Sequence, residues 1–464
     1  MSATHPTSKP VPNSVLRRAV GASALGNAVE WFDYGIYAYG VAHISNALFP
    51  SGSDSAVAFT LLGFALSFLI RPIGGFFWGP LGDRIGRKKV LAATILLMAG
   101  STVLVGVIPS YATIGIWAPI LLYLLRMLQG FSTGGEYGGA ATFMAEYAPD
   151  RRRGFWGSFL EFGTLAGFNL GALLMLLLTN VLSDSQMDTW GWRLPFLVAG
   201  PLGLIGSYLR SKMQDTPVYR DLEKQDEVQE SPARNLRDLV AKYSPQIFQL
   251  FGLVLALNVV NYTLISYMPT YLQDAIGLSD NGALIVPVIG QFLMMAVLPF
   301  LGALSDRVGR KPLWATSLIS LAVLSVPMFA LMSTGTVGAM VAFAVLALLY
   351  APQLSTISAT FPAFFPAHVR FAGLALSYNV ATSLFGGTAP VFNDRLISWS
   401  GDDLWPAYYM SGACVIGLVA LWFVLETKGV SLRGKEIPGT EAAEEEARAA
   451  AAAEELEPVP TLKR

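Results

Sequence analysis

The 464-residue sequence is poor in the residues that form disulfides, metal sites and hydrolytic triads. It has one cysteine, Cys414, which excludes an intrachain disulfide, and only three histidines, His5, His43 and His368. No Ser–His–Asp set, Cys–His set, metal-ligand cluster or phosphate-binding glycine loop is visible, so we expect no cofactor. A membrane enzyme would need such a set, and the sequence therefore argues against one.

Charged residues are also scarce. Asp, Glu, Lys and Arg make up 14% of the chain, whereas a soluble protein carries about a quarter. Hydrophobic residues make up 53%, and the mean hydropathy is +0.50. They form runs of roughly 20 residues, each long enough to cross a hydrocarbon core about 30 Å thick. The sequence predicts an all-α, polytopic membrane protein that has the lipid bilayer, and not a nucleic acid, as its partner.

Twelve apolar runs are predicted to span the membrane, in two pseudo-symmetric sets of six. We expect the spans near 19–47, 57–81, 89–109, 114–143, 155–180, 193–211, 245–274, 283–304, 312–333, 337–362, 371–397 and 405–426. The predicted domains are an N-terminal tail (1–18), a six-helix bundle (19–211), a polar central loop (212–244), a second six-helix bundle (245–427) and a tail rich in alanine and glutamate (428–464).

Lysine and arginine collect in alternate connections, namely DRIGRKK, DRRRG, the 212–243 loop, DRVGRKP and PAHVR. The opposite connections carry acids instead: Asp54, Asp184, Asp188, Asp274, Asp402 and Asp403. Basic loops favour the cytoplasmic side, so both termini and the central loop are expected in the cytoplasm of a cell-membrane protein. The polar N-terminus, with no cleavage site after the first apolar run, is interpreted as a cytoplasmic tail.

The two halves repeat a charged motif. LGDRIGRKKV (81–90) returns as LSDRVGRKPL (304–313), each time after the second span of its half. A weaker repeat after the fourth span aligns Pro149 with Pro366 and Arg153 with Arg370. Two halves related as a parallel repeat predict a binding site between them, near the middle of the membrane.

The repeated motif is a candidate cytoplasmic gate. A carboxylate at a helix end can pair with an arginine across a two-helix turn, and this pair must break if the halves separate on that side. The gate residues are Asp83, Arg84, Arg87 and Lys88 in the first copy, and Asp306, Arg307, Arg310 and Lys311 in the second. The same charges can also simply anchor the loops in the cytoplasm, and the two roles are compatible.

The first span contains two acids, Glu30 and Asp33, in the stretch GNAVEWFDYGIYAYG (26–40). Asp33 lies beside a helical stripe formed by Asn27, Glu30, Tyr34 and Tyr37. Both acids fall near mid-bilayer, where a charge costs at least about 2.5–3.5 kcal/mol and so needs a cavity or a partner. We predict a proton-coupling role for Glu30, Asp33 or Glu161, a third acid in FLEFGTLAGFN; the alternative is a structural ion pair.

Two arginines lie inside spans of the first half. Arg126 heads a polar stripe that includes Gln129, and Arg71 precedes a proline that should kink the second span. An arginine within a span can clamp a carboxylate with two hydrogen bonds. For Arg126 the carboxylate is that of the substrate, or that of Glu30 or Asp33. Arg71 either pairs internally or lies near the external end.

The second half is almost free of charge within its spans. Its amides and phenols can hold a carboxylate by hydrogen bonds or an ammonium by cation–π contact, although Asn also commonly packs helices together. Proton chemistry is thus expected in the first half and substrate shaping in the second. The candidate substrate-binding residues are Tyr34, Tyr37, Arg71, Arg126, Gln129, Asn258, Asn261, Tyr262, Gln291, Tyr350 and Asn379.

The motif GDRIGRKK resembles the signature loop of the major facilitator superfamily. Together with GNAVEWFDYGIY, RPIGGFFWGPLGDRIGRKK and WGWRLPF, it resembles the metabolite–proton symporter subfamily over about 19–427. The segments AEYAPDRRRGFWGSFLEFGTLAGF, LNVVNYTLISYMPTYL and LPFLGALSDRVGRKP are most similar to proline/betaine osmolyte–proton symporters.

That resemblance implies proton-coupled import of small zwitterionic solutes such as proline, glycine betaine or ectoine, by alternating access, in a functional monomer. The alternative is symport of an organic anion such as 2-oxoglutarate, citrate or shikimate. The tail EAAEEEARAAAAAEELE departs from the family pattern, since it favours a helix but lacks the heptads of a coiled coil. This departure puts osmosensing by a coiled coil in doubt, but not transport.

Overall fold

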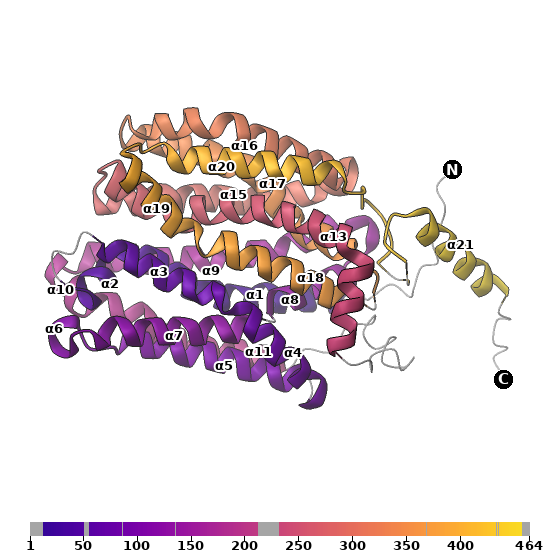
Figure 1. Ribbon diagram of the computed structural model, residues 1–464, viewed down its shortest axis with the longest axis horizontal. Helices are drawn as coiled ribbons and strands as arrows, with labels where there is room; N and C mark the ends of the chain where they lie inside the picture. Colours follow the sequence, from indigo (N-terminus) through magenta and orange to yellow (C-terminus); the bar gives the residue numbers. More distant parts are fainter. Residues whose placement is uncertain are drawn as a thin grey trace.

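The computed structural model describes residues 13–50, 55–85, 87–134, 136–211, 232–367, 369–432, 434 and 436–456. Within these ranges the regular elements are helices, and most of them run along the long axis of the molecule (Figure 1). One end of the bundle contains both the start of the first long helix and the end of the last long helix. We call it the terminus end. A last helix, α21 (Glu441–Leu456), extends beyond that end, as expected for the alanine- and glutamate-rich tail.

The first half contains the helices up to residue 211. They are α1 (Asn13–Tyr39), α2 (Val41–Leu48), α3 (Ala56–Leu69), α4 (Arg71–Ile85), α5 (Arg87–Gly106), α6 (Tyr111–Ile114), α7 (Trp117–Thr133), α8 (Glu136–Tyr147), η1 (Asp150–Arg152), α9 (Arg153–Val181), α10 (Asp184–Thr189), η2 (Gly191–Arg193) and α11 (Leu194–Ser211).

The second half begins after residue 231. Its elements are α13 (Pro232–Asn261), η3 (Tyr262–Tyr267), α14 (Met268–Thr270), η4 (Tyr271–Ala275), α15 (Asp280–Val308), α16 (Arg310–Met332), α17 (Thr336–Thr360), η5 (Phe361–Phe364), α18 (Arg370–Ala381), η6 (Thr382–Gly386), α19 (Ala389–Ser400) and α20 (Trp405–Trp422).

Seven helical segments of the described chain are long and apolar enough to cross a membrane: 56–78, 150–181, 239–275, 280–308, 310–332, 336–364 and 405–422. The other five predicted spans correspond to α1, α5, the α7–α8 pair, α11 and the α18–η6–α19 series. The long helices therefore match the predicted twelve-span arrangement in number and order.

Several spans are interrupted where the sequence carries a helix breaker. Helices α3 and α4 meet at Ile70, just before Arg71 and Pro72, where a kink was expected. Helix α13 departs from helical geometry at Tyr243, two residues before Pro245. Farther along the same span, Tyr262–Tyr267 is wound as a π-helix, a widening that often marks functional sites.

The two halves lie against each other over the full length of the bundle. In Figure 1 the first half (indigo to magenta) forms the lower part and the second half (rose to yellow) the upper part. Helix α9 packs on α15 across this boundary, and α3 packs on η6 and α19. A Cβ atom on Gly302 would lie 2.4 Å from the carbonyl oxygen of Gly154, so the two backbones touch there.

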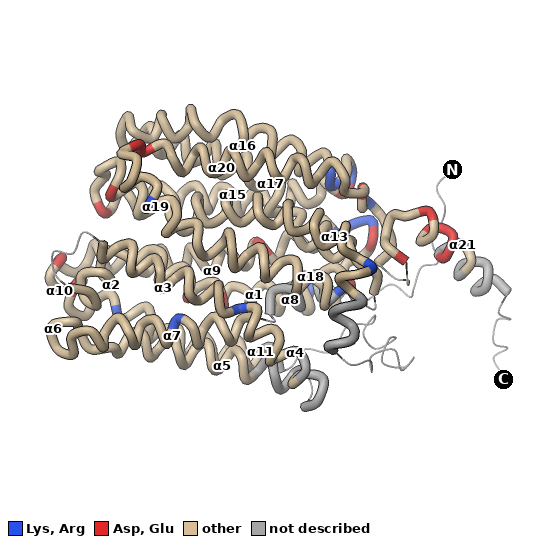
Figure 2. The backbone as a smooth tube through the Cα atoms, in the orientation of Figure 1, with Lys and Arg blue, Asp and Glu red and all other residues tan. Residues whose placement is uncertain are grey.

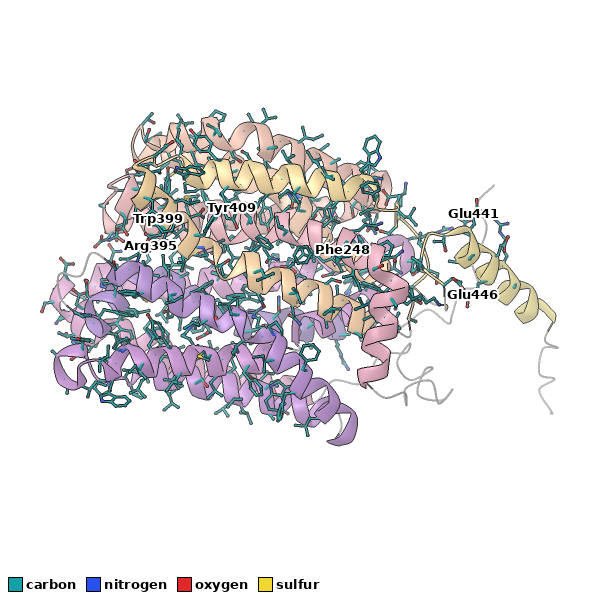
Figure 3. All side chains as sticks on the ribbon, in the orientation of Figure 1. Phe248, Arg395, Trp399, Tyr409, Glu441 and Glu446 are labelled. Atoms are coloured by element: carbon teal, nitrogen blue, oxygen red, sulfur yellow. The ribbon has the colours of Figure 1, made fainter. Side chains whose placement is uncertain are left out.

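The outer surface is suited to lipid. Large apolar side chains point outward from both halves, among them Phe248, which is 73% exposed, and Trp399, which is 76% exposed (Figure 3). Charged residues gather at the two ends of the bundle, while its middle is mostly uncharged (Figure 2). The few charges in the middle are buried, so each of them needs a specific explanation.

Candidate functional site

Asp33 is held by three polar side chains from two neighbouring helices. Arg126 Nη1 on α7 lies 3.0 Å from Asp33 Oδ2, and Gln129 Nε2 donates to Oδ1 at 3.0 Å. The Thr102 hydroxyl of α5 donates to the same Oδ1 at 2.8 Å. Asp33 is 1% exposed and Arg126 0% exposed. Both charged groups are thus buried and hydrogen-bonded to each other and to neighbouring polar groups, as compensation for the burial of two charges requires.

The helical stripes predicted from the sequence explain most of this cluster. Arg126 and Gln129 are one turn apart on α7, and Arg126 Nη1 also donates to Gln129 Oε1 at 2.8 Å. The guanidinium lies 4.2 Å from the ring centre of Tyr37, one turn beyond Asp33 on α1. Sequence reasoning missed Thr102, although a polar residue in the middle of an apolar run was the available signal.

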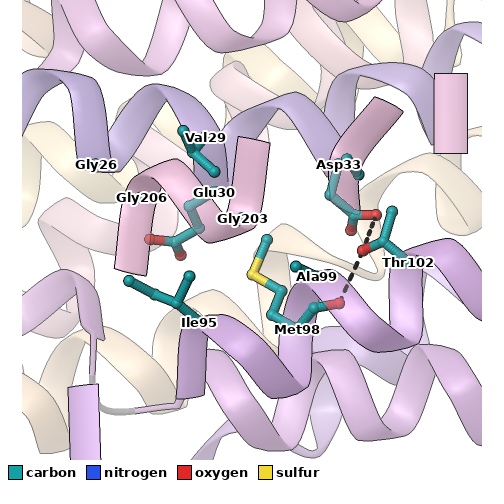
Figure 4. A pocket seen from close by; sticks show the side chains of 11 residues that line it. Gly26, Val29, Glu30, Asp33, Ile95, Met98, Ala99, Thr102, Gly203 and Gly206 are labelled. Carbon is teal, nitrogen blue, oxygen red and sulfur yellow. Dashed lines mark hydrogen bonds between the residues drawn. The ribbon is translucent and has the colours of Figure 1, made fainter. Parts of the chain in front are cut away.

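Glu30 points into a different space from the Arg126 cluster. A small cavity between α1, α5 and α11 is lined by both acids of the first span and otherwise mostly by apolar or small residues (Figure 4). Its lining residues are Gly26, Val29, Glu30, Asp33, Ile95, Met98, Ala99, Thr102, Ala199, Gly203 and Gly206. The Glu30 side chain extends toward Ile95, and Asp33 lies near the opposite side, bonded to Thr102. We call this space the α1–α5–α11 cavity.

Arg71 is buried among aromatic rings at the start of α4. Its Nη2 donates to the hydroxyl of Tyr34 at 2.7 Å, and its guanidinium lies 4.0 Å from the ring centre of Phe68. It is 2% exposed. Glu30 and the phenol of Tyr262 are the nearby groups that interact with it electrostatically, besides Tyr34. In this structure Arg71 is thus an internal partner of the first span.

A second cavity lies between the two halves. Helices α1 and α9 contribute Trp31, Glu161 and Thr164 from the first half, and α13, η3, α17 and α18 form the remaining walls. Those walls are Leu257, Asn258, Asn261, Tyr262, Tyr350, Leu354, Ile357 and Tyr378. Of the predicted site residues, the structure brings Glu161, Asn258, Asn261, Tyr262 and Tyr350 together here. We call this space the central cavity.

The polar groups of the central cavity are only partly satisfied within the protein. The Tyr350 hydroxyl donates to Asn261 Oδ1 at 3.0 Å, and Asn258 Nδ2 donates to the Thr382 hydroxyl at 3.0 Å. The indole Nε1 of Trp31 is buried and has no hydrogen-bond partner among the described residues. A buried donor in that condition costs about 1–3 kcal/mol, so a ligand that accepts from it would be stabilised.

Trp31, Thr164 and Tyr378 line the central cavity and were not among the predicted site residues. Trp31 lies one helical turn after Asn27, on the predicted stripe of α1, so periodicity could have found it. Asn27 itself ties α1 to α9, since its Nδ2 donates to the Leu160 carbonyl at 2.9 Å and to Thr164 at 2.6 Å.

Three other candidate substrate-binding residues lie outside the central cavity. The Tyr37 hydroxyl donates to the carbonyl of Thr60 at 2.7 Å. Gln291 Nε2 donates to the Tyr39 hydroxyl at 2.7 Å, across the two halves. Asn379 Nδ2 reaches the Gly134 carbonyl at 2.9 Å, also across the halves. For these residues a role in substrate binding stays a prediction, and the structure gives each of them a packing contact.

At the terminus end the halves are joined through the second copy of the repeated motif. The two carboxylate oxygens of Asp306 accept the backbone N–H groups of Gly154 at 2.8 Å and Phe155 at 2.9 Å, at the start of α9. Arg310 Nη2 pairs with Asp306 Oδ1 at 2.7 Å. A carboxylate at a helix N-terminus is favoured by the helix dipole. The side chains of Asp83, Arg84, Arg87 and Lys88 in the first copy lie outside the described set.

The weaker repeat after the fourth span is expressed in matching contacts. Arg153 Nε donates to the carbonyl of Ala145, and Arg370 Nε to that of Pro362, in both cases eight residues back. Arg370 also pairs with Glu146 of the first half at 3.0 Å. The chain after α20 crosses both arginines, because Arg153 Nη1 donates to the Val430 carbonyl at 2.9 Å and Arg370 Nη2 to the Leu432 carbonyl at 2.6 Å.

Contacts also join the halves at the opposite end. Asn180 of α9 and Asn281 of α15 exchange side-chain hydrogen bonds of 3.0 and 3.1 Å. Nearer the middle of the bundle, the Ser383 hydroxyl donates to the Phe68 carbonyl at 2.7 Å. With contacts between the halves at both ends, the structure represents an occluded state around the central cavity.

The described residues contain no group of three or more His, Cys, Asp or Glu side chains that could hold a metal ion. The arrangement is instead a membrane bundle of two similar halves, with a cavity between them and the buried Asp33–Arg126 ion pair inside the first half. The family pattern described as "Major Facilitator Superfamily" matches residues 23–390. The chain belongs to the major facilitator superfamily. Members of this superfamily are membrane transporters, and the chain is a transporter rather than an enzyme.

Relatives of known name match over most of their length. The proline/betaine transporter of Salmonella typhimurium is 42% identical over 433 residues, which cover 91% of this chain and 86% of that protein. The glycine betaine/proline/ectoine/pipecolic acid transporter OusA of Dickeya dadantii is 42% identical, with 90% and 85% covered. The ectoine/proline transporter ProP of Corynebacterium glutamicum is 42% identical, with 91% and 87% covered.

A solved structure confirms the fold. The proton:xylose symporter XylE, bound to 6-bromo-6-deoxy-D-glucose, superposes with a TM-score of 0.72 over 95% of this chain and 100% of that chain. The two sequences are 20% identical, so this likeness shows the fold alone.

Proposed function

We propose that this transporter imports small zwitterionic solutes of the proline, glycine betaine and ectoine class, driven by protons, through alternating access of the central cavity. The named relatives transport solutes of this class. The observation that carries the proposal is the lining of the central cavity. There Trp31 and Glu161 of the first half face tyrosines and amides of the second half.

The lining matches the two charges of a zwitterion. The rings of Trp31, Tyr262, Tyr350 and Tyr378 offer π faces to a cationic nitrogen, and cation–π attraction reaches about 2 kcal/mol in a desolvated site. Glu161 supplies a negative charge on the same side as Trp31. The amides of Asn258 and Asn261, together with the unpartnered indole N–H of Trp31, supply donors for a carboxylate.

The same lining disfavours the rival class of substrate. Among the residues that line the central cavity, Glu161 is the one with a formal charge, and no lysine or arginine is present. A dicarboxylate such as 2-oxoglutarate would need cationic partners here, because burying unpaired charges is strongly unfavourable. An organic-anion symporter is therefore the less favoured function.

Asp33 is the proposed proton carrier. In the structure its carboxylate is paired with Arg126, and protonation would cancel the charge that holds this pair together. Arg126 would then lose its charged partner inside the bundle, and the contact between α1 and α7 would weaken. Protonation thus favours a different placement of α1, as a coupled conformational change requires.

A chain of aromatic contacts connects this ion pair to the central cavity. Arg126 lies 5.5 Å from the ring centre of Tyr34, and the ring centres of Tyr34 and Trp31 are 5.3 Å apart. Trp31 in turn lies 6.5 Å from Tyr262 across the halves. Movement of α1 on protonation would therefore shift the walls of the solute site directly.

The proposed orientation places the terminus end in the cytoplasm. Described residues of the basic connections, such as Arg153 at the start of α9 and Arg310 at the start of α16, lie at that end of the bundle, in agreement with the positive-inside rule. The contacts of Asp306, Arg153 and Arg370 then form the cytoplasmic gate.

Uptake by the reconstituted protein tests the proposal. Labelled proline, betaine, ectoine and 2-oxoglutarate are offered to proteoliposomes with an acidic exterior, and accumulation is measured with and without a protonophore. At least one zwitterion should accumulate, and the protonophore should abolish its accumulation. If only the dicarboxylate accumulates, the substrate class is wrong; if accumulation survives the protonophore, the coupling is wrong.

A further inference from the structure

The two acids of α1 both line the α1–α5–α11 cavity, whereas the proposed solute site is the central cavity. The α1–α5–α11 cavity and the central cavity share no lining residue. Glu30 and Trp31 are neighbours in sequence, yet Glu30 lines the first cavity and Trp31 the second. One helix therefore separates a space that contains both carboxyl groups from the space whose lining matches a zwitterion.

The α1–α5–α11 cavity leads from Asp33 toward the terminus end. Glu30 precedes Asp33 by three residues, which is about 4.5 Å along the helix axis, on the side where α1 begins. Gly26 and Gly206 line the cavity farther in the same direction. The cavity therefore extends from Asp33 toward the terminus end as far as the level of Gly26 and Gly206.

The lining of this cavity, two carboxyl groups and a hydroxyl among apolar and small residues, suits water. It has room for about one or two water molecules, and the oxygen atoms of Glu30, Asp33 and Thr102 are available as polar partners. Small residues keep it open where α11 faces α1 and α5. A Cβ atom on Gly206 would sit 3.4 Å from Val29 Cγ1, inside the space that is now empty.

Arg126 pairs with Asp33 rather than with Glu30. On α1, Asp33 is the acid next to Glu30. Glu30 also interacts electrostatically with Arg71 of α4 and with the phenol of Tyr262. The residues that α5 and α11 contribute to the cavity carry no charge. Arg126 is instead bonded to Asp33, Gln129 and Ser67.

We infer that Glu30 is a proton relay, which passes the proton of Asp33 to the terminus end through the α1–α5–α11 cavity, apart from the solute path. This inference rests on the proposed function of Asp33. The neutral carboxyl of Asp33 gives its proton to a cavity water, and that water gives a proton to the carboxylate of Glu30. Glu30 then releases a proton to water at the terminus end. Asp33 is left ionised and pairs again with Arg126, so charge and protons balance.

This arrangement separates two gates. The solute path at the terminus end is closed by Asp306, Glu146 and Arg370, none of which lines the α1–α5–α11 cavity. Asp33 can therefore lose its proton while the solute gate is shut. Loss of the relay should slow net transport, which needs proton release in every cycle, and should spare solute exchange, which does not.

Kinetic and thermodynamic measurements on Glu30→Gln in proteoliposomes test the relay. The initial rate of uptake driven by a pH gradient should fall about tenfold or more, as expected for the loss of a proton-transfer group. Exchange of labelled for unlabelled solute at equal pH should stay within twofold of the wild type, and so should the final accumulation ratio. Glu30→Asp, which keeps the carboxyl group, should recover part of the rate.

A second variant tests the route without changing a titratable group. Gly206→Ala fills the cavity beside Val29 and should slow net uptake but not exchange, whereas Gly100→Ala on α5, where a Cβ atom meets nothing within 4 Å, should leave both unchanged. If Glu30→Gln and Gly206→Ala both show normal net uptake, the relay is wrong. Parallel loss of exchange and net uptake in Glu30→Gln would also overturn it, because Glu30 would then act on the solute or on the conformational change.

The Asp33→Asn variant separates failure of the proposed function of Asp33 from failure of the relay. If that variant still accumulates solute, the proposed function of Asp33 fails, whatever Glu30 does. If it does not accumulate solute while Glu30→Gln transports at the normal rate, the proposed function stands and only the relay fails.

Discussion

The two halves of the transporter have similar folds and bury different chemistry at mid-membrane. The first half encloses Asp33 and Arg126 as an ion pair and places Glu30 in a cavity that Asp33 also lines. At the same depth the second half presents amides and phenols, such as Asn261 hydrogen-bonded by Tyr350. Buried charge can change with protonation, whereas amides and phenols stay neutral at physiological pH.

This difference suggests a division of labour. The half that contains titratable groups would sense the proton, and the uncharged half would shape the solute site. At the terminus end, by contrast, the halves share a feature, since Arg153 and Arg370 make the same contact eight residues back. Changes in five parts of the molecule would break or sharpen this comparison, from the largest expected effect to the smallest.

Asp33→Asn should have the largest effect. The side chain then mimics the protonated acid permanently, so the pH gradient can no longer drive uptake, and the accumulation ratio should fall to about one. Exchange at equal pH should persist, because the solute site is in the central cavity. Proteoliposome uptake and exchange measure the two quantities side by side. Normal accumulation would contradict the assignment of proton coupling to the first half.

Arg126→Ala should destabilise the protein strongly. Removing one partner of a buried ion pair costs about 3–5 kcal/mol, because the other charge is left uncompensated. Thermal unfolding in detergent should show a lowered midpoint, and adding Asp33→Asn should recover most of the loss. Arg448→Ala on α21, where Arg448 is exposed, is the control and should have no effect. Additive losses in the double variant would mean that the pair is not coupled.

Trp31→Ala should weaken solute binding about 10–30-fold, from the loss of up to about 2 kcal/mol of cation–π attraction. Tyr350→Phe, which removes only the hydroxyl that Asn261 accepts, should weaken it about 2–10-fold. Measurements of KM for exchange separate these effects from proton coupling. Trp399→Ala, at an exposed position, should change nothing. Unchanged KM values for Trp31→Ala and Tyr350→Phe would place the solute elsewhere.

Asp306→Asn should loosen the terminus end. It removes a carboxylate that caps α9 and pairs with Arg310, and such a charge at a helix N-terminus is worth about 0.3–2 kcal/mol. The test uses a background in which Cys414 is replaced by serine and Ser358, which is buried in the closed state, by a reporter cysteine. In this background the reporter should react with a maleimide about 2–30-fold faster when Asp306→Asn is added. Asp280→Asn, at the exposed start of α15, is the control. An unchanged rate would remove Asp306 from the gate.

Removal of residues 441–464 should have the smallest effect. Helix α21 lies beyond the bundle and carries no heptad seam for pairing, so uptake should stay within about twofold of the full-length chain at each osmolality. The chain up to residue 440 keeps the contacts of Val430 and Leu432 with the two arginines. A large loss of osmotic response would give the tail a regulatory role.

The sequence predicted the membrane class, the number and order of the spans, the internal repeat and the family, because apolar length and repeated motifs are local or periodic properties. It also identified both acids of α1 and the polar stripe of α7, because helical spacing fixes which residues share a face. The choice between Asp33 and Glu30 as the partner of Arg126 depended on how α1, α5 and α7 pack, which no local pattern encodes.

The tertiary structure alone decided how the candidate residues are grouped. It placed Glu161 and Asn258 in one cavity and sent Gln291 and Asn379 to contacts between the halves. It also added Thr102 to the ion pair and Trp31 to the solute site. Residue type and spacing determined which side chains had to be polar inside the membrane. Helix rotation and the close packing of segments far apart in the chain decide which of these side chains meet. The separation of the α1–α5–α11 cavity from the central cavity is therefore a property of the folded bundle.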